Sequence, residues 1–396
     1  MDSRLSTLVA RYYLYMATST LGFLIPVWVL LLDEARAFSY TQITLLDVVF
    51  FSTILLAELP TGYVGDRLGR RNALVCSSVG VGLSAAAFGV AQSFTAFLVV
   101  YVAWGVAQTF RTGNDSAWLY DTLSRYAEEA TFTRVRGRGM AVLLAANTVT
   151  AVAGGYLYTM NPAYPFYATG VVNVLSGVVL LTMPEELGET EEAFTLSKAR
   201  RAIGGLAAPS LRWFVVYVSL FFAVGWSADL FIQPISRAAG LDVVGLGYLY
   251  ALLSAVAALA SNYAGALADR VGISTLLHAA PLLLGAGLVL VGLLPVAAAP
   301  VFLFARGLLS MAGPISETYV NERTPALGRA TVLSATSMLL SLSSIPVKLV
   351  SGPIADATSL FVTVAVLGGA LLVVSAVLLV ARRPVHGPVS AEAVDG

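Results

Sequence analysis

The chain contains few charged residues, one cysteine and two histidines. Only 12% of its 396 residues are charged, whereas 58% are apolar, and 23 acidic side chains balance 23 basic ones. A soluble domain usually carries about a quarter charged residues. This composition excludes a water-soluble fold and indicates that lipid is the solvent. The zero formal charge also removes the bulk attraction that a nucleic-acid partner would need.

The scarcity of cysteine, histidine and lysine excludes several kinds of site. Cys76 is the single cysteine, so neither an intrachain disulfide nor a cysteine-based zinc site can form. His278 and His386 lack the spacing of a metal pair, and we expect no metal and no cofactor. Neither Lys198 nor Lys348 follows the glycine that a nucleotide-binding P-loop requires. The sequence also lacks a histidine cluster and a nucleophile elbow, so it favours no enzyme.

Twelve apolar runs are each long enough to cross a bilayer, which takes about twenty residues. We expect membrane-spanning helices at 8–32, 40–64, 73–91, 94–121, 139–160, 165–184, 211–235, 243–267, 274–295, 299–321, 329–350 and 358–381. The sequence therefore predicts an all-α integral membrane protein with twelve transmembrane helices.

One polar segment divides the chain into two six-helix halves. It covers 185–210 and combines a run of glutamates with Lys198, Arg200 and Arg201, which is typical of a solvated linker. We therefore predict an N-terminal half at 1–184, a C-terminal half at 211–381 and a tail at 382–396.

Basic residues are distributed unequally between the two sides of this topology. The loops of one side hold only Arg36 and Arg237, whereas most other arginines fall on the opposite side. The positive-inside rule makes the richer side cytoplasmic, with both termini there. We expect a multi-pass protein of the plasma membrane, which in a bacterium is the inner membrane.

A short motif occurs twice, about two hundred residues apart and at equivalent places in the two halves. In the loops after the second and eighth spans, a glycine is followed by an Asp-Arg dipeptide and then by a second glycine. The motif residues are Gly62, Asp66, Arg67, Gly69, Arg70 and Arg71 in the first copy, and Gly265, Asp269, Arg270 and Gly272 in the second. Internal repeats of this kind are typical of transporter folds.

The duplicated loop resembles the G-x-x-x-D-R-x-G-R-[KR] motif of the major facilitator superfamily, and the likeness covers nearly the whole chain. The stretches 113–121 and 329–334 resemble one bacterial branch that contains many efflux permeases. The fifth span keeps the glycine pair of drug antiporters, Gly154 and Gly155, without the proline before it. The resemblance implies two pseudo-symmetric halves and export more than uptake.

The loop motif also has a physical interpretation. Its glycines permit tight turns and close helix approach. Asp66 and the three arginines form a charge cluster that could pair in one conformation and separate in another. The arginines also hold the loop cytoplasmic. We predict that Glu58, one turn before Gly62, joins this network or binds a proton.

Ionisable residues at membrane depth are costly and are therefore functional candidates for a proton or substrate path. Arg111 and Asp115, one turn apart, are either a self-neutralising pair or a proton site that faces a cavity. Asp47 and Asp229 line an outer vestibule or lie at the interface. Arg306 and Glu317 share one face of the tenth span, about three turns apart.

Aromatic residues are less informative. Trp104, Trp118, Trp226 and Tyr319 lie near these polar residues and could form a cavity wall, although ordinary packing explains each of them. We assign Tyr12, Tyr13 and Tyr15 to an interfacial belt. Lys348 is expected to extend its amine to the interface.

These features predict a secondary active transporter that works by alternating access, as a monomer, with a small-molecule substrate. Protons are the first candidate for the coupling ion because carboxylates occur within the spans. Export of a hydrophobic or amphipathic compound is the first candidate for the transport function, and uptake or exchange of a sugar or another small metabolite is the alternative. A membrane sensor or scaffold that has lost transport is an alternative of another class.

Overall fold

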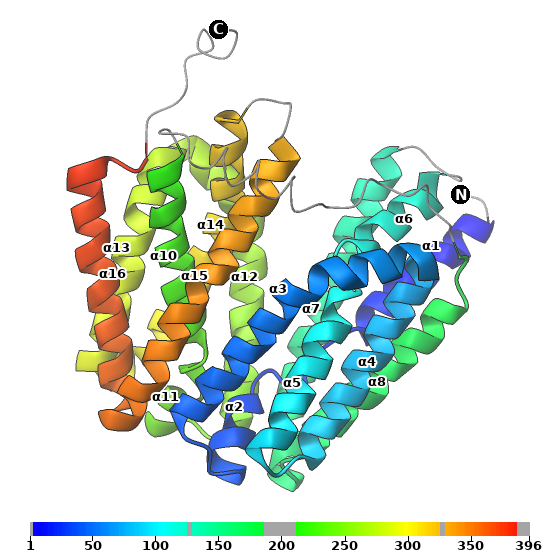
Figure 1. The fold of residues 1–396 in the computed structure, drawn as a ribbon, viewed down its shortest axis with the longest axis horizontal. Helices are drawn as coiled ribbons and strands as arrows, with labels where there is room; N and C mark the ends of the chain where they lie inside the picture. Colours follow the sequence, from blue (N-terminus) through cyan, green and yellow to red (C-terminus); the bar gives the residue numbers. More distant parts are fainter. Residues whose placement is uncertain (1–2, 125–128, 186–210, 325–328, 386–396) are drawn as a thin grey trace, which may run out of the picture. The chain divides into compact units, whose positions relative to one another are not determined.

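The computed structural model describes residues 3–124, 129–185, 211–324 and 329–385, and every regular element in these ranges is a helix (Figure 1). Ten of these helices are long and apolar enough to cross a membrane, or eleven when the bent pair α10–α11 counts as one span. The predicted all-α membrane fold is confirmed, and the count is consistent with twelve spans. The predicted linker, apart from Glu185, and the tail beyond 385 lie outside the described residues.

The chain divides into two compact units. Unit 1 holds Met1–Phe38, Leu46–Ala193 and Asp242–Ser254. Its helices are α1 (Ser3–Thr18), α2 (Trp28–Leu30), a π-helical turn (Leu31–Ala35), most of α3 (Tyr40–Leu68), α4 (Arg70–Val90), α5 (Phe94–Thr109), α6 (Asn114–Ser124), α7 (Glu129–Met160) and α8 (Tyr164–Leu181).

Unit 2 holds Ser39–Leu45, Phe194–Leu241 and Ala255–Gly396. Its helices are α10 (Arg212–Asp229), α11 (Ile232–Ala238), most of α12 (Val243–Val271), α13 (Ile273–Leu293), a 3-10 turn (Pro295–Ala297), α14 (Ala298–Glu322), α15 (Arg329–Ala357) and α16 (Leu360–Arg382). The start of α3 thus groups with unit 2, and the start of α12 groups with unit 1.

Each unit contains one especially close helix pair, α4 with α8 in unit 1 and α13 with α16 in unit 2 (Figure 1). Facing glycines explain the close approach. A Cβ added at Gly82 would lie 2.8 Å from the Gly170 carbonyl oxygen, and one added at Gly285 would lie 2.8 Å from that of Gly368. Any larger residue would push these backbones apart, so the glycines permit the interhelical van der Waals contact that stabilises helices in lipid.

Three of the predicted spans are broken helices, which corrects the expectation of continuous ones. The first, predicted over 8–32, is helical to Thr18 and irregular over 19–27. The fourth is divided into α5 and α6, with Gly113 at a φ of +79° between them. The seventh bends by 50° between α10 and α11. Hydropathy predicted the length of each segment but not the interruption within it.

Side chains from neighbouring helices satisfy the backbone of the first break. The Asn147 side-chain oxygen on α7 accepts hydrogen bonds from the Thr20 hydroxyl at 2.7 Å and the Leu21 amide at 3.2 Å. The Asn173 amide on α8 donates to the Thr20 carbonyl at 2.9 Å. In lipid an unsatisfied backbone group costs several kcal/mol, so these partners allow the irregular segment to exist at membrane depth.

Candidate functional site

The two copies of the loop motif adopt the same backbone conformation. Gly69 separates α3 from α4 at a φ of +86°, and Gly272 separates α12 from α13 at +90°. Each amide donates to the carbonyl four residues before it, at 3.0 Å for Gly69 and 2.8 Å for Gly272. Only glycine adopts this region readily. The second glycine of each copy is therefore what permits a one-residue turn.

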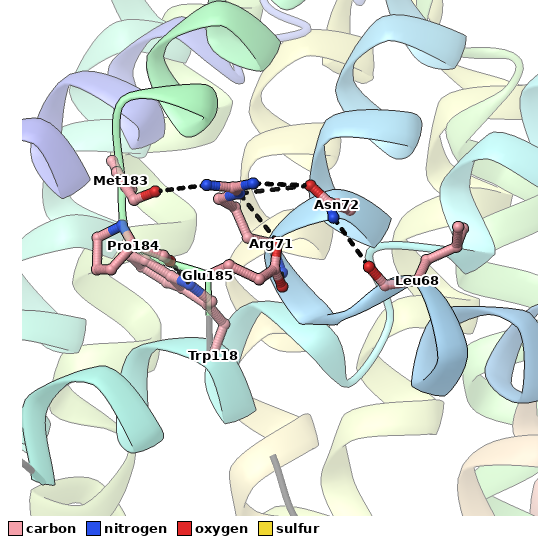
Figure 2. Close-up of polar contacts among 7 residues, drawn as sticks. All are labelled: Leu68, Arg71, Asn72, Trp118, Met183, Pro184 and Glu185. Atoms are coloured by element: carbon pink, nitrogen blue, oxygen red, sulfur yellow. Dashed lines mark hydrogen bonds and ion pairs between the residues drawn. The ribbon is translucent and has the colours of Figure 1, made fainter. Parts of the chain in front are cut away.

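The first copy connects α4 with α6 and the end of α8 (Figure 2). The Arg71 guanidinium pairs with Glu185 at 3.0 Å and donates to the Met183 carbonyl at 2.9 Å. Trp118 on α6 donates its indole N–H to the Pro184 carbonyl at 3.1 Å. These contacts hold the chain that leaves α8 against the start of α4.

The neighbouring arginine forms a second ion pair. Arg70 pairs with Asp121 on α6, and the side chains are 16% and 29% exposed. Sequence reasoning gave no role to Asp121 or Glu185. They lie 51 and 114 residues from their partners, and nothing in the local pattern marks them.

The other motif residues make fewer contacts. The Arg67 guanidinium carbon lies 4.4 Å from the centroid of the Tyr63 ring, and Glu58 is exposed. A Cβ at Gly62 would meet nothing within 4 Å, so the close approach expected there is not made. The side chain of Asp66 lies outside the described residues, and its gating role stays a prediction.

Among the residues that the structure describes, the second copy forms no ion pair like those of the first. Gly265, Asp269 and Arg270 are exposed, and neither charged residue pairs with a side chain that the structure describes. Within the described ranges, the duplication therefore extends to the backbone but not to the charge network.

The break between α5 and α6 carries the predicted pair Arg111 and Asp115. The Asp115 amide still donates to the Arg111 carbonyl at 3.3 Å, one turn away. The two side chains interact electrostatically but form no ion pair within 4.0 Å. The Arg111 guanidinium carbon lies instead 5.7 Å from the Tyr15 ring centroid.

Two tyrosines of α1 belong to this site, which corrects their assignment to an interfacial belt. Tyr12 is 1% exposed and Tyr15 is fully buried. The Tyr12 ring stacks on Trp118, with centroids 6.5 Å apart and an angle of 25°. Residue type alone could not distinguish a belt from a buried helix face, because tyrosine is frequent at both.

Five side chains thus form one polar cluster within unit 1. All of them interact electrostatically with one another or through a shared partner. The polar cluster comprises Tyr12, Tyr15, Arg111, Asp115 and Arg136. Arg136, on α7, was predicted only as a basic residue of the cytoplasmic side.

Unit 2 holds an ion pair between two of the residues predicted within spans. Asp229, at the end of α10, pairs with Arg306 on α14, and the side chains are 38% and 29% exposed. The pair lies beside the bend between α10 and α11. The sequence predicted both residues as candidates separately, and the structure brings them together. Glu317, also on α14, is exposed and makes no ion pair with a described residue.

The remaining candidates contact aromatic neighbours or lie in the protein interior. Trp104 lies edge-on to Phe50 and Phe88, with centroids 6.2 Å away in each case. Asp47 is half-buried. Lys348 is only 3% exposed, which corrects the expectation that it extends to the interface.

Unit 2 contributes the other two aromatic candidates. Trp226 packs on Phe222 at 5.3 Å, and Tyr319 lies between Phe214 at 4.1 Å and the Arg323 guanidinium at 3.6 Å. Packing accounts for these contacts, and a shared cavity wall stays a prediction. No group of three or more metal-ligating side chains occurs in the part of the chain that the structure describes.

Comparison with known sequences identifies one family. A family model described as Major Facilitator Superfamily matches residues 9–347. The uncharacterised MFS-type transporter YxaM of Bacillus subtilis is 23% identical over 240 residues, which are 59% of this chain and 59% of that relative. The uncharacterised MFS-type transporter MJ1317 of Methanocaldococcus jannaschii is 24% identical over 133 residues, or 34% of this chain and 32% of that one. The matches thus span less than two thirds of these curated relatives.

Solved structures share the fold along nearly the whole chain. The nucleoside transporter NupG aligns with a TM-score of 0.76 and 12% identity, over 96% of this chain and 99% of that one. A bacterial homologue of the human lysosomal transporter Spinster, in an inward-facing and unoccupied conformation, aligns with a TM-score of 0.73 and 16% identity. That alignment covers 96% of this chain and 95% of the homologue. At these identities the likeness shows the fold alone.

Proposed function

Because this chain belongs to the major facilitator superfamily, a family of membrane transporters and not of enzymes, we propose that it is a secondary active transporter. We propose further that it works by alternating access and couples proton movement to the export of a small hydrophobic or amphipathic compound. The observation that carries the proposal is the polar cluster at the break between α5 and α6. Broken helices with ionisable side chains are where transporters of this kind bind substrate and coupling ions.

Asp115 is the carboxylate best suited to carry the proton. One of its side-chain oxygens is buried and has no hydrogen-bond partner among the described residues. Arg111 and Arg136 interact with it electrostatically without closing an ion pair. A carboxylate that is not locked to one arginine can exchange a proton while the arginines adjust its affinity. Asp47, Glu58 and Glu317 are the next candidates.

The ion pairs of the loop motif support the conformational part of the proposal. Arg70 with Asp121, and Arg71 with Glu185, join α4 to α6 and to the segment that follows α8, through charges that remain partly exposed. Partly exposed pairs are weak enough to break and re-form during a transport cycle. We propose that Asp66 joins this network in the conformation that the ion pairs stabilise.

The distribution of basic residues supports the orientation. We propose that the loop motif, both termini and the linker lie on the side richer in arginine, and that this side is cytoplasmic. The chain would act as a monomer in the plasma membrane, with protons and one small molecule as its partners.

Uptake or exchange of a small metabolite is a second candidate. It is favoured by the names of two kinds of structural neighbour, a nucleoside transporter and a POT family transporter in complex with a peptide conjugate. Both candidates require the same fold and the same proton site, and they differ in substrate and direction.

The experiment that tests the proposed function measures pH inside proteoliposomes that contain the purified protein. Lipophilic cations, dyes, organic acids, sugars and nucleosides are added one at a time, with protein-free liposomes as the control. We expect one class to cause a pH change that requires the protein. A compound that crosses only with the protein and leaves the pH unchanged would contradict proton coupling. If no compound of the set crosses or changes the pH, although insertion of the protein has been verified, the result would contradict transport and favour the sensor or scaffold.

A further inference from the structure

The polar cluster contains hydrogen-bonding atoms without a partner. The hydroxyl of Tyr12, one carboxylate oxygen of Asp115 and one terminal nitrogen of Arg136 are all buried and form no hydrogen bond with a described residue. The buried Tyr15 hydroxyl interacts with the Ser19 side chain. Both tyrosines are at least 99% buried. A buried polar atom without a partner costs about 1–3 kcal/mol, so three of them in one cluster point to a ligand that the cluster receives.

The cluster is also electrostatically unbalanced. It contains two guanidinium groups, on Arg111 and Arg136, and one carboxylate, on Asp115. Its net charge is therefore positive whether Asp115 is ionised or protonated. A positive charge within a bundle of apolar helices requires a compensating anion, because burying an unpaired charge is costly.

The unpartnered groups match one ligand chemistry. A guanidinium and a phenolic hydroxyl are donors that can converge on the oxygens of a carboxylate or a phosphate. Trp118 and the other buried apolar side chains packed around the tyrosines would contact an apolar body attached to such a group. Thr112 and Gly113, which follow Arg111 in the break, are exposed.

We propose that the polar cluster binds the acidic group of the transported compound, so that the substrate is an amphipathic organic anion that carries a carboxylate or a phosphate. This inference rests on the proposed function and names its substrate class. It agrees with export, because an inside-negative membrane potential favours the outward movement of an anion.

Binding of matched ligands to the purified protein tests this inference without a transport assay. Phenylacetate, phenylacetamide and phenethylamine share a ring and differ in charge, and phenyl phosphate provides the phosphate arm. Affinities are measured from the rise in thermal unfolding temperature with ligand concentration. We expect at least one of the two anions to bind about tenfold more tightly than the amide and the amine. The stronger anion distinguishes a carboxylate from a phosphate site.

Two variants and one control on neighbouring positions make the test specific. Arg136→Gln should lower the affinity for the preferred anion about tenfold and leave the affinity for the amide unchanged. Tyr12→Phe keeps the ring stacked on Trp118 and should lower the affinity for the anion several-fold. This variant keeps the test decisive if Arg136→Gln fails to fold. Arg134→Gln, on the same helix but exposed, should bind like the wild type.

Three results would overturn the inference. They are equal or tighter binding of the amine or the amide, an anion affinity that neither Arg136→Gln nor Tyr12→Phe lowers, and no stabilisation by any of the four ligands. A protein that binds anions as expected but moves no proton would contradict the proposed function and leave this site standing. Proton-coupled transport of a cation, without anion binding, would contradict the anion site and leave the proposed function standing.

Discussion

Replacing Gly69 with alanine should destabilise the protein for two separate reasons. At a φ of +86° and a ψ of 147°, a residue with a Cβ is strained by about 1–3 kcal/mol. The added Cβ would also meet the carboxylate of Glu185, which pairs with Arg71. Displacing that carboxylate weakens a partly exposed ion pair, which costs about 1 kcal/mol more. We expect a total loss of about 2–4 kcal/mol in the free energy of unfolding.

Two other glycines of the motif provide matched controls. Gly272 has the same backbone conformation, at a φ of +90°, but its Cβ would lie 3.8 Å from the nearest atom, a Thr275 hydroxyl. Gly272→Ala should therefore show the backbone strain alone, about 1–3 kcal/mol. Gly62 lies within α3, and its Cβ would meet nothing within 4 Å. Gly62→Ala should stabilise the helix by about 0.5–1 kcal/mol, because alanine loses less conformational entropy.

The assay is equilibrium unfolding in mixed micelles, after membrane insertion of each variant has been verified. The expected order of stability runs from Gly69→Ala, the lowest, through Gly272→Ala and the wild type to Gly62→Ala. If Gly69→Ala is as stable as Gly62→Ala, the one-residue turn does not require glycine. If Gly69→Ala loses only as much stability as Gly272→Ala, the Glu185 carboxylate does not lie against Gly69.

Three further predictions concern contacts that the sequence did not reveal. Trp118→Phe keeps the ring on Tyr12 but loses the hydrogen bond to the Pro184 carbonyl, and should lower the free energy of unfolding by about 1–2 kcal/mol; an unchanged value would mean that the bond adds nothing. Asp356 on α15 caps the start of α3, because it accepts hydrogen bonds from the amides of Tyr40 and Thr41 and from the Thr41 hydroxyl. Asp356→Ala should therefore lower the free energy of unfolding by about 1–2 kcal/mol in the same assay. A loss below about 0.5 kcal/mol, as at an ordinary surface position, would contradict this capping role. A double-mutant cycle of Asp229→Asn and Arg306→Gln should give a coupling energy of about 1 kcal/mol, because both side chains are partly exposed, and additive single effects would show that the pair contributes no stability.

The predictable part of the fold was the part that hydropathy and repetition determine. Apolar runs located every long helix, since the bilayer fixes the length of a span. The bounds were less exact, because α1 ends at Thr18, α7 begins at Glu129 and α15 ends at Ala357, against predicted bounds of 32, 139 and 350. The two copies of the loop motif predicted equivalent turns, and Gly69 and Gly272 adopt the same conformation. A positive φ at such a position depends on a local feature, the missing Cβ, which the sequence states directly.

The breaks and the partners were not predictable in the same way. Gly113 takes a positive φ inside an apolar run, whereas Gly62 and Gly265 do not, and hydropathy treats all three alike. Asp121 and Glu185 are remote in sequence from the arginines that they bind. Contacts of this kind depend on which helix faces meet, and a single sequence does not record them.

The helix faces also decided the composition of the polar cluster. Arg111 and Asp115 were found from their cost in lipid, which the residue type reveals. Tyr12, Tyr15 and Arg136 were not found, because tyrosine and arginine near a span end are usually explained by the interface and by topology. Their burial is a property of the packed unit.

The most direct test of the account measures transport by Asp115→Asn in proteoliposomes, with the compound that the wild type carries. Two activities are compared: exchange of labelled for unlabelled compound at equal pH, and accumulation against a gradient driven by a pH difference. If Asp115 carries the coupled proton, Asp115→Asn keeps the exchange and loses the accumulation. Undiminished pH-driven accumulation in this variant would show that Asp115 does not carry the coupled proton and would assign the proton to another carboxylate.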